Sequence, residues 1–175
     1  MPPVVRIQAF QRIAKLVGNT PLIEIFQTRG SSRVLSKIEY YNPSGSVKDR
    51  AAKGMLEAAL KADQLADRTI IEATSGNTGI SIAMFGSALG LPVKLVMPKN
   101  VSPERIQLLQ AYDVQIHFSD WRSGTNGSIA MAQEIVGEGG PYFMPYQYGN
   151  SANPGAHYEG TGREIVETLP DVDVF

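Results

Sequence analysis

The chain has 175 residues, of which 43% are hydrophobic and 19% charged, and its formal net charge is −1. This composition is typical of a globular protein with its own core, and the balanced charge gives no indication of a nucleic-acid partner. The absence of cysteine excludes disulfides, thiolate zinc sites and cysteine nucleophiles. No apolar stretch approaches the roughly 20 residues that span a bilayer, and the N-terminus lacks a signal-peptide core. We therefore expect a cytoplasmic protein without a membrane partner.

Apolar, β-branched runs alternate with helical patterns along the chain. Strands are predicted over 34–40, 68–74, 92–98, 114–119, 142–146 and 172–175. Helices are predicted after Lys48 and over 77–90, 102–113, 127–137 and 157–169. The first of these has an apolar stripe of Ala52, Met55, Leu56, Ala59 and Leu60. This alternation predicts an α/β fold with parallel sheets and helices on both faces, and a ligand site at the carboxyl ends of the strands.

Several common catalytic motifs are absent from the sequence. It has no P-loop, no nucleophile elbow and no complete dinucleotide fingerprint, and no carboxylate spacing indicates a metal site. Of the two histidines, His117 lies in a predicted strand and is interpreted as structural. His157 starts a predicted helix and could cap that helix or line a site.

The segment TSGNTG, residues 74–79, follows a predicted strand and opens a helix. Its small residues leave backbone N–H groups accessible at the positive end of the helix, where a carboxylate or phosphate binds well. Ser75, Asn77 and Thr78 add side-chain donors. An ordinary strand-to-helix turn explains the segment equally well.

Lys48 lies where a loop of turn-forming residues, NPSGSV, meets an alanine-rich helix. The positive end of the helix dipole repels an ammonium group there, and a neutral amine is the form that Schiff-base chemistry needs. Ser46 and Asp49 also fit the S-x-x-D pattern of a capped helix, in which case Lys48 is a solvated surface residue.

The segment YQYGNSANPGAHYEGTG, residues 146–162, is rich in amides, glycines and aromatic rings. Gln147 follows a predicted strand and could reach into a cleft at the strand end. The alternative is an irregular loop that is packed by its own tyrosines.

Taken in order, five segments resemble the cysteine synthase family, which belongs to the fold type II pyridoxal-phosphate enzymes. They are VGNTPLIEI (17–25), NPSGSVKDRAA (42–52), EATSGNTGISIAM (72–84), MPKNVSPERIQLLQAYDVQIHFS (97–119) and QYGNSANPGAHYEGTGREI (147–165). The similarity runs from Ile13 to the last residue, and five ordered motifs make it specific.

The resemblance implies a role for each matching site residue. Lys48 would be the catalytic lysine that forms a Schiff base with pyridoxal 5'-phosphate, and Asn77 would bind the ring hydroxyl of this cofactor. The α-carboxylate of the amino-acid substrate would be bound by Thr74, Ser75, Thr78 and Gln147. Family members are commonly homodimers.

The implied reaction is a β-replacement that makes L-cysteine from an activated serine and a sulfur donor. The serine derivative would be O-acetylserine or O-phosphoserine, and the donor would be sulfide or a thiocarboxylated sulfur-carrier protein. The stretches YQYGN and HYEGTG resemble more closely the branch that uses O-phosphoserine and the carrier protein. Thr78 favours cysteine synthases over serine/threonine dehydratases, which more often have histidine at that position.

Members of this family are longer than this chain. The resemblance therefore implies a smaller α/β domain over 46–146, with 1–45 and 147–175 contributing to a larger cofactor domain that is incomplete here. Asp113, Ser151 and Arg163 depart from the residues usual in the family, but none has an implied role.

Two other interpretations stay open from the sequence. One is a truncated, non-catalytic relative that acts as a binding or regulatory partner. The other is a related pyridoxal-phosphate lyase such as cystathionine β-synthase. The intact TSGNTG loop and Lys48 favour an enzyme, because a non-catalytic relative needs neither.

Overall fold

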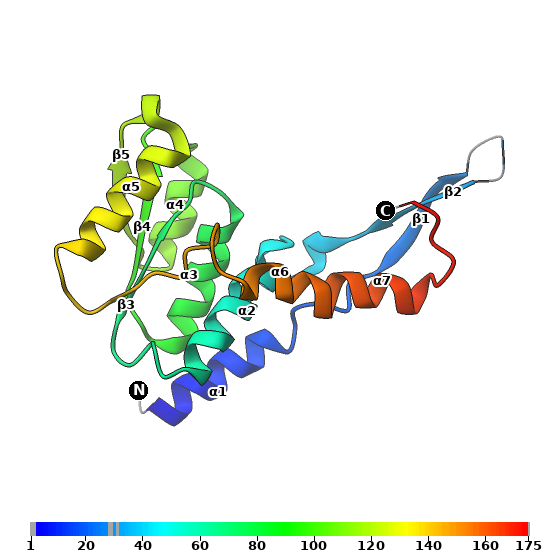
Figure 1. Ribbon diagram of the computed structural model, residues 1–175, viewed down its shortest axis with the longest axis horizontal. Helices are drawn as coiled ribbons and strands as arrows, with labels where there is room; N and C mark the ends of the chain where they lie inside the picture. The colour runs from blue at the N-terminus through cyan, green and yellow to red at the C-terminus, as the bar shows by residue number, and fades with distance from the viewer. Residues whose placement is uncertain (1–2, 28–29, 31, 175) are drawn as a thin grey trace.

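The structure, a computed structural model, describes residues 3–27, 30 and 32–174. Its larger body is built around a four-stranded sheet in the order β5-β4-β3-β6, in which all neighbours are parallel (Figure 1). The strands are β3 (Thr69–Ala73), β4 (Val93–Pro98), β5 (Gln115–Ser119) and β6 (Tyr142–Phe143). This parallel sheet, flanked by helices, confirms the predicted α/β fold class.

Helices cover both faces of the sheet, and each face has its own hydrophobic core. One core includes α1 (Pro3–Ala14), α2 (Lys48–Lys61), α3 (Asn77–Leu89) and α4 (Pro103–Ala111), and the other includes α5 (Gly124–Gly137). Because side chains alternate along a strand, Ile70 packs in the first core and Ile71 in the second. Strands that are buried on both faces form continuous apolar runs, which is why the sequence predicts β3 and β4 closely.

The predicted stripe of α2 lies in the core. Its buried members are Ala52, Met55, Leu56 and Ala59, and Leu60 packs half-buried against them. Gly90 ends α3 in the left-handed conformation, with φ 62° and ψ 31°, as is typical of a glycine just after a helix.

The N-terminal part contains two elements that the sequence patterns do not predict, α1 and β1. The rings of Phe10 in α1 and Phe85 in α3 lie 5.1 Å apart between centroids. β1 (Leu22–Gln27) pairs antiparallel with β2 (Arg33–Lys37) in a hairpin that extends away from the larger body (Figure 1). β2 ends before the predicted residue 40, because η1 (Glu39–Tyr41) turns the chain.

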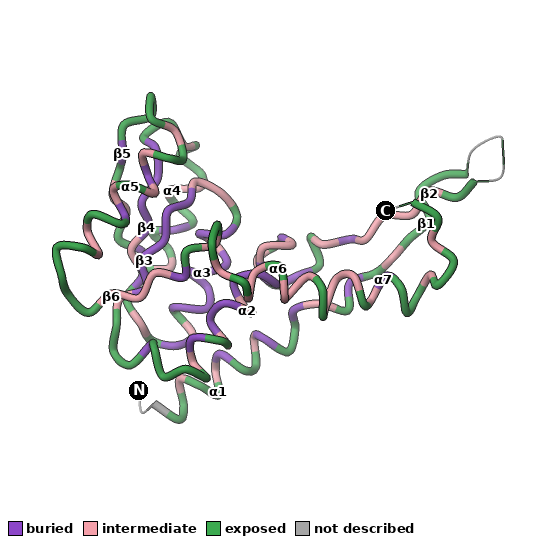
Figure 2. Tube along the Cα trace, in the orientation of Figure 1, coloured by how far each residue is buried: buried purple, intermediate pink, exposed green. Residues whose placement is uncertain are grey.

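Burial separates these two parts of the molecule. Buried residues concentrate around the parallel sheet, whereas every residue of β1 after Leu22 is exposed (Figure 2). The division into domains at 46–146 stays a prediction, and α1 shares a core with α2 and α3. None of the helices in the described ranges is long and apolar enough to cross a bilayer.

The chain after β5 departs from the predicted pattern. The predicted strand 142–146 stops at Phe143, because Pro145 has no N–H for a ladder and Tyr146 has a φ of 52°. The predicted helix 157–169 belongs to a longer run of α6 (Ala152–Ala156), the π-helical η3 (His157–Gly162) and α7 (Arg163–Thr168). Residues 172–174 form no strand, so that prediction is wrong for them, since no described strand pairs with them. Phe175 lies outside the described residues.

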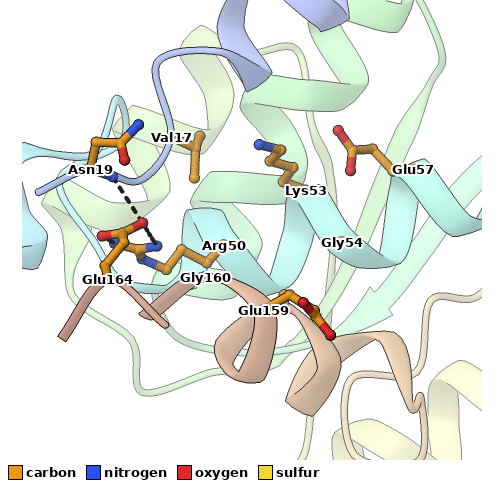
Figure 3. A pocket seen from close by; sticks show the side chains of 10 residues that line it. Val17, Asn19, Arg50, Lys53, Gly54, Glu57, Glu159, Gly160 and Glu164 are labelled. Carbon is orange, nitrogen blue, oxygen red and sulfur yellow. Dashed lines mark hydrogen bonds and ion pairs between the residues drawn. The ribbon is translucent and has the colours of Figure 1, made fainter. Parts of the chain in front are cut away.

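A buried ionic cluster links the hairpin, α2 and α7. Arg50 donates to the two carboxylate oxygens of Glu164 at 2.7 and 2.8 Å, and from Nε to Glu39 at 2.8 Å. Lys37 Nζ lies 2.7 Å from Glu164. The Asn19 N–H donates to Glu164 at 3.0 Å, beside Arg50 (Figure 3). Bidentate pairing of arginine with a carboxylate is strong and directional, so this cluster fixes the segments relative to one another.

The cluster lowers the pKa values of its carboxylates. Burial by itself raises the pKa of Glu164, but hydrogen bonds from Arg50, Lys37 and the Asn19 N–H outweigh burial and lower the pKa to about 2. Burial likewise acts to raise the pKa of Glu39, and the hydrogen bonds that it accepts, chiefly from Arg50, lower the pKa below its ordinary value. Both groups are therefore charged at neutral pH, where their pairing stabilises the fold.

We expect Glu164→Gln to lower the free energy of unfolding by about 2–4 kcal/mol at pH 7, because Arg50 and Lys37 would lose their shared partner. The folded-state pKa of Glu164 lies below its ordinary value of 4.5, so this stabilisation is complete above that pH. It is lost as the pH falls from 4.5 toward 2. Urea denaturation across this range should show the difference between variant and wild type shrinking on acidification.

Glu167→Gln is the matched control in the same helix. The Glu167 carboxylate pairs with Arg163 at 2.7 Å, but both side chains are exposed. Exposed pairs of this kind contribute less than about 1 kcal/mol. Equal losses of stability in the two variants would contradict the role assigned to the buried cluster.

Candidate functional site

The loop of residues 74–76 connects the carboxyl end of β3 to the start of α3. The Thr74 N–H donates to Val96 O at 3.0 Å and extends the ladder, and the Gly76 N–H donates to Thr74 Oγ1 at 3.2 Å. Arg105 of α4 donates to Ser75 O at 2.7 Å. These bonds hold the loop from both sides, and no bond among the described residues occupies the Ser75 hydroxyl or the exposed Asn77 amide.

The start of α3 lies close to the sheet because Gly79 permits it. A Cβ on Gly79 would lie 2.8 Å from Leu95 Cδ1 and 3.0 Å from Thr74 Cγ2. The first N–H groups of a helix have no acceptor within the helix, and they form its positive end. This edge of the sheet is therefore suited to an anionic group.

Gln147 joins this edge from the other end of the chain. The Thr78 hydroxyl donates to Gln147 Oε1 at 2.8 Å, and Gln147 Nε2 donates to Ala73 O at 3.2 Å. The structure thus brings together two predicted substrate-binding residues that are 69 positions apart. Asn153 donates to Gln147 O at 2.9 Å and fixes the backbone at this point.

Lys48 is the first residue of α2, and its side chain is half-buried. Within the described ranges, no hydrogen bond or ion pair engages the Lys48 amine. Its backbone N–H donates to Ser46 Oγ at 3.2 Å. Burial lowers the pKa of His157, and the positive charges of Lys48 and then Arg50 lower it further, which indicates that His157 in η3 faces this end of α2.

Asp49 does not cap α2, so the S-x-x-D interpretation is wrong for this residue. Its fully buried carboxylate accepts hydrogen bonds from the Ser44 N–H at 2.7 Å, from the Ser44 hydroxyl, and from the Ser81 hydroxyl at 2.6 Å. Ser81 Oγ also lies 3.1 Å from Asn77 O. The residue next to Lys48 is therefore tied to the first turn of α3.

Glu72 is a site residue that the sequence patterns miss. It is fully buried in β3, and it accepts hydrogen bonds from the Ala73 N–H at 3.0 Å and the Gln147 N–H at 3.2 Å. Burial raises the pKa of Glu72 to about 7, against the lowering effect of its hydrogen bonds with the Ala73, Gln147 and Tyr146 backbone. The signal for it was an acid inside the apolar run TIIEA.

The six predicted site residues thus fall into two connected groups. Thr74, Ser75, Asn77, Thr78 and Gln147 lie at the carboxyl edge of β3 and the start of α3. Lys48 begins the neighbouring helix, which the Asp49–Ser81 hydrogen bond joins to that edge. No three metal-ligating side chains cluster within the described residues.

A cavity of about 330 Å³ lies beside Arg50 (Figure 3). Most of the residues that line it are charged or small, and none of them is a predicted site residue. The lining residues are Val17, Asn19, Arg50, Lys53, Gly54, Glu57, Ala156, Glu159, Gly160 and Glu164. Because Glu39, Glu164 and Thr20 already engage Nε, Nη1 and Nη2 of Arg50, we place the candidate site at the sheet edge.

Comparison with known proteins identifies relatives over most of this chain. A cysteine synthase of Aquifex aeolicus is 42% identical over 165 residues, covering 90% of this chain and 50% of the relative. A probable cysteine synthase of Bacillus subtilis is 40% identical over 162 residues, covering 91% and 52%. The chain therefore spans about half the length of these curated relatives.

Solved structures are similar in fold as well as in sequence. A hydrogen sulfide-producing enzyme from Fusobacterium nucleatum has a TM-score of 0.81 at 40% identity, covering 90% of this chain and 52% of its own. A cysteine synthase from Entamoeba histolytica has a TM-score of 0.82 at 35% identity, covering 90% and 49%. The family model for pyridoxal-phosphate-dependent enzymes matches residues 13–175. These findings confirm the resemblance seen in the sequence, and the chain belongs to the family of pyridoxal-phosphate-dependent enzymes.

Proposed function

We propose that this chain carries the lysine and the substrate-carboxylate edge of a pyridoxal-phosphate-dependent cysteine synthase. The observation that carries the proposal is the half-buried Lys48 amine, which has no partner among the described residues and is tied through Asp49 to the helix start where Thr78 meets Gln147. The names of the relatives support this assignment. This chain spans about half the length of these relatives, so the activity of a full-length enzyme is part of the proposal.

The residues present fit pyridoxal phosphate. Lys48 offers a free amine for covalent attachment, and the uncommitted, exposed Asn77 amide can donate to the ring hydroxyl. When bound, the cofactor supplies an electron sink for chemistry at the α-carbon of an amino acid. We assign Lys48 and Asn77 to cofactor binding on these grounds.

Lys48 also has a place for moving a proton. A lysine that acts as a base needs an amine that is free of other partners, and the Lys48 amine has none among the described residues. Among the described residues no carboxylate pairs with Lys48 to hold its ammonium, because Asp49 is engaged by Ser44 and Ser81. We therefore assign to Lys48 the removal of the α-proton of the substrate and its return at the end of the reaction.

The α-carboxylate of the substrate is assigned to Thr74, Ser75, Thr78 and Gln147. Thr78 and Gln147 satisfy each other in the structure, so a carboxylate would replace one neutral hydrogen bond with charge-assisted bonds. The unpaired N–H groups at the start of α3 add positive potential at the same place. This pairing keeps the two side chains in position before the substrate arrives.

The full reaction that we propose is a β-replacement on an activated serine, O-acetylserine or O-phosphoserine. The sulfur donor is sulfide or a thiocarboxylated carrier protein, and the working unit is a homodimer. Residues 46–146 would form the smaller domain, and the segments on either side would contribute to the larger one.

Lys48→Ala should abolish both turnover and the visible absorption of the lysine-bound cofactor, because no amine remains at the start of α2. Lys53→Ala is the matched control, since Lys53 lies in the same helix but lines the cavity beside Arg50. Absorbance of the dialysed, cofactor-loaded proteins and a sulfhydrylase assay decide the result. Normal turnover of Lys48→Ala would rule out the assignment.

Gln147→Ala should weaken amino-acid binding while it leaves cofactor loading largely intact. A hydrogen bond to a charged group contributes about 1.5–3 kcal/mol, or roughly 10- to 100-fold in affinity. Calorimetric titration with O-acetylserine and O-phosphoserine measures this loss, and Gln133→Ala on the exposed side of α5 is the control. Unchanged affinity in Gln147→Ala would show that Gln147 is only structural.

A further inference from the structure

Glu72 occupies a position where an apolar residue is the ordinary choice. It lies between Ile71 and Ala73 in a strand of the parallel sheet whose other buried members are apolar, and its exposed fraction is 0%. Among the described residues no lysine, arginine or histidine pairs with it. Burying a carboxylate without a cation is unfavourable unless hydrogen bonds compensate. The acid at this position therefore has to be explained by what it bonds to.

The bonding partner beyond its own strand is the turn that contains Gln147. Tyr146 has a left-handed φ of 52°, a strained conformation for a bulky residue. Gln147 follows it directly and donates its N–H to Glu72 Oε2 at 3.2 Å. The preceding Pro145 has no N–H, so it cannot serve as an alternative donor.

Two asparagine side chains bind carbonyl groups of this turn, whereas Glu72 binds the N–H group of Gln147. Asn150 donates to Pro145 O at 2.8 Å, and Asn153 donates to Gln147 O at 2.9 Å. The neighbour of Glu72 in β3, Ala73, accepts a hydrogen bond from Gln147 Nε2 at 3.2 Å. The end of β3 thus holds both the backbone and the side chain of Gln147.

We propose that Glu72 is a positioning residue that holds Gln147 in place to bind the substrate carboxylate together with Thr78. This inference rests on the proposed function, in which Gln147 binds that carboxylate. Glu72 itself is buried and does not contact the substrate. Its Oε1 accepts the Ala73 N–H within β3 and its Oε2 accepts the Gln147 N–H, so the carboxylate anchors the Gln147 turn to β3, and the Gln147 side chain meets Thr78 at the start of α3.

The electrostatic setting agrees with an anchor of this kind. Both Glu72 oxygens accept backbone N–H groups, an arrangement that suits the ionised form. The titratable group that faces it is Tyr148, whose pKa is raised first by its own burial and then by the charge on Glu72. A neutral glutamine at position 72 keeps the size of the side chain but offers one acceptor oxygen instead of two.

The test uses the cofactor-loaded protein and the variants Glu72→Gln, Gln147→Ala and their double variant. We expect Glu72→Gln to bind the amino-acid substrate about tenfold more weakly and to raise KM by a similar factor, with kcat and cofactor absorption little changed. In the Gln147→Ala background, the same change at position 72 should alter affinity by less than about twofold, because the residue through which it acts is gone. Glu134→Gln, on an exposed part of α5, is the matched control and should have no effect.

A second measurement does not depend on the cofactor or the substrate. Backbone amide exchange at Gln147 should be at least about tenfold faster in Glu72→Gln than in the wild type and in Glu134→Gln. Unchanged exchange at Gln147, or an equal loss of affinity in both backgrounds, would overturn the proposal. If Gln147→Ala itself binds substrate normally, the proposed function of Gln147 fails, while faster exchange would still support the contact between Glu72 and the turn.

Discussion

The buried guanidinium of Arg50 joins segments that are far apart in the sequence. It bonds Glu39 after the hairpin, Thr20 in the N-terminal loop and Glu164 in α7. Its own position in the first turn of α2 is two residues from Lys48, so the cluster that orders these segments also orders the helix start that carries the lysine. Removal of either carboxylate would leave Arg50 with a single anionic partner in a largely buried site, which is unfavourable.

Three successive residues at this helix start have three different environments. Successive residues of a helix are rotated by about 100° around its axis, so Lys48, Asp49 and Arg50 face different neighbours. Asp49 binds Ser81 of α3, and Arg50 enters the ionic cluster. Lys48, in contrast, has no bonded partner among the described residues. A free amine on a rigid support is what a lysine needs for covalent chemistry, and here the two residues after it provide the support.

Glu164 and Glu72 show how the pKa of a buried glutamate can shift in opposite directions. Glu164 is surrounded by cations, so its lowered pKa stabilises the fold above pH 4.5. Burial raises the pKa of Glu72 to about 7, because the backbone N–H groups that bond it lower the pKa less than burial raises it, so the folded state binds a proton more readily than the unfolded chain between pH 4.5 and about 7. Its ionisation therefore reduces the free energy of unfolding as the pH rises through that range. A residue that weakens the fold at neutral pH is one whose presence needs another explanation, and the Gln147 turn provides it.

Sequence patterns predict the parts of this structure whose signal is local. The stripe of α2, the buried runs of β3 and β4 and the left-handed Gly90 each depend on neighbouring residues. α1 and β1 lack such a signal, because α1 is ordered by packing on α3, and β1 has an exposed pattern without the alternation of a half-buried strand. The contact between Thr78 and Gln147 spans 69 positions, and only the resemblance to a known family placed both residues in one site.

Sequence reasoning assigned Asp49 wrongly and overlooked Glu72 for the same reason, because tertiary contacts decide the role of each residue. The motif S-x-x-D predicts a helix cap, but Asp49 finds better donors in Ser44 and Ser81 once α2 packs on α3. In the same way Glu72 is an isolated acid in an apolar strand until the chain returns, through Tyr146, to place the Gln147 N–H above it. Both carboxylates are buried without a cationic partner among the described residues, and both bond a segment from elsewhere in the chain. A buried acid is therefore evidence of a long-range partner, and here one partner, Ser81, lies in α3 and the other, Gln147, contacts Thr78 at the start of that helix, where we place the substrate.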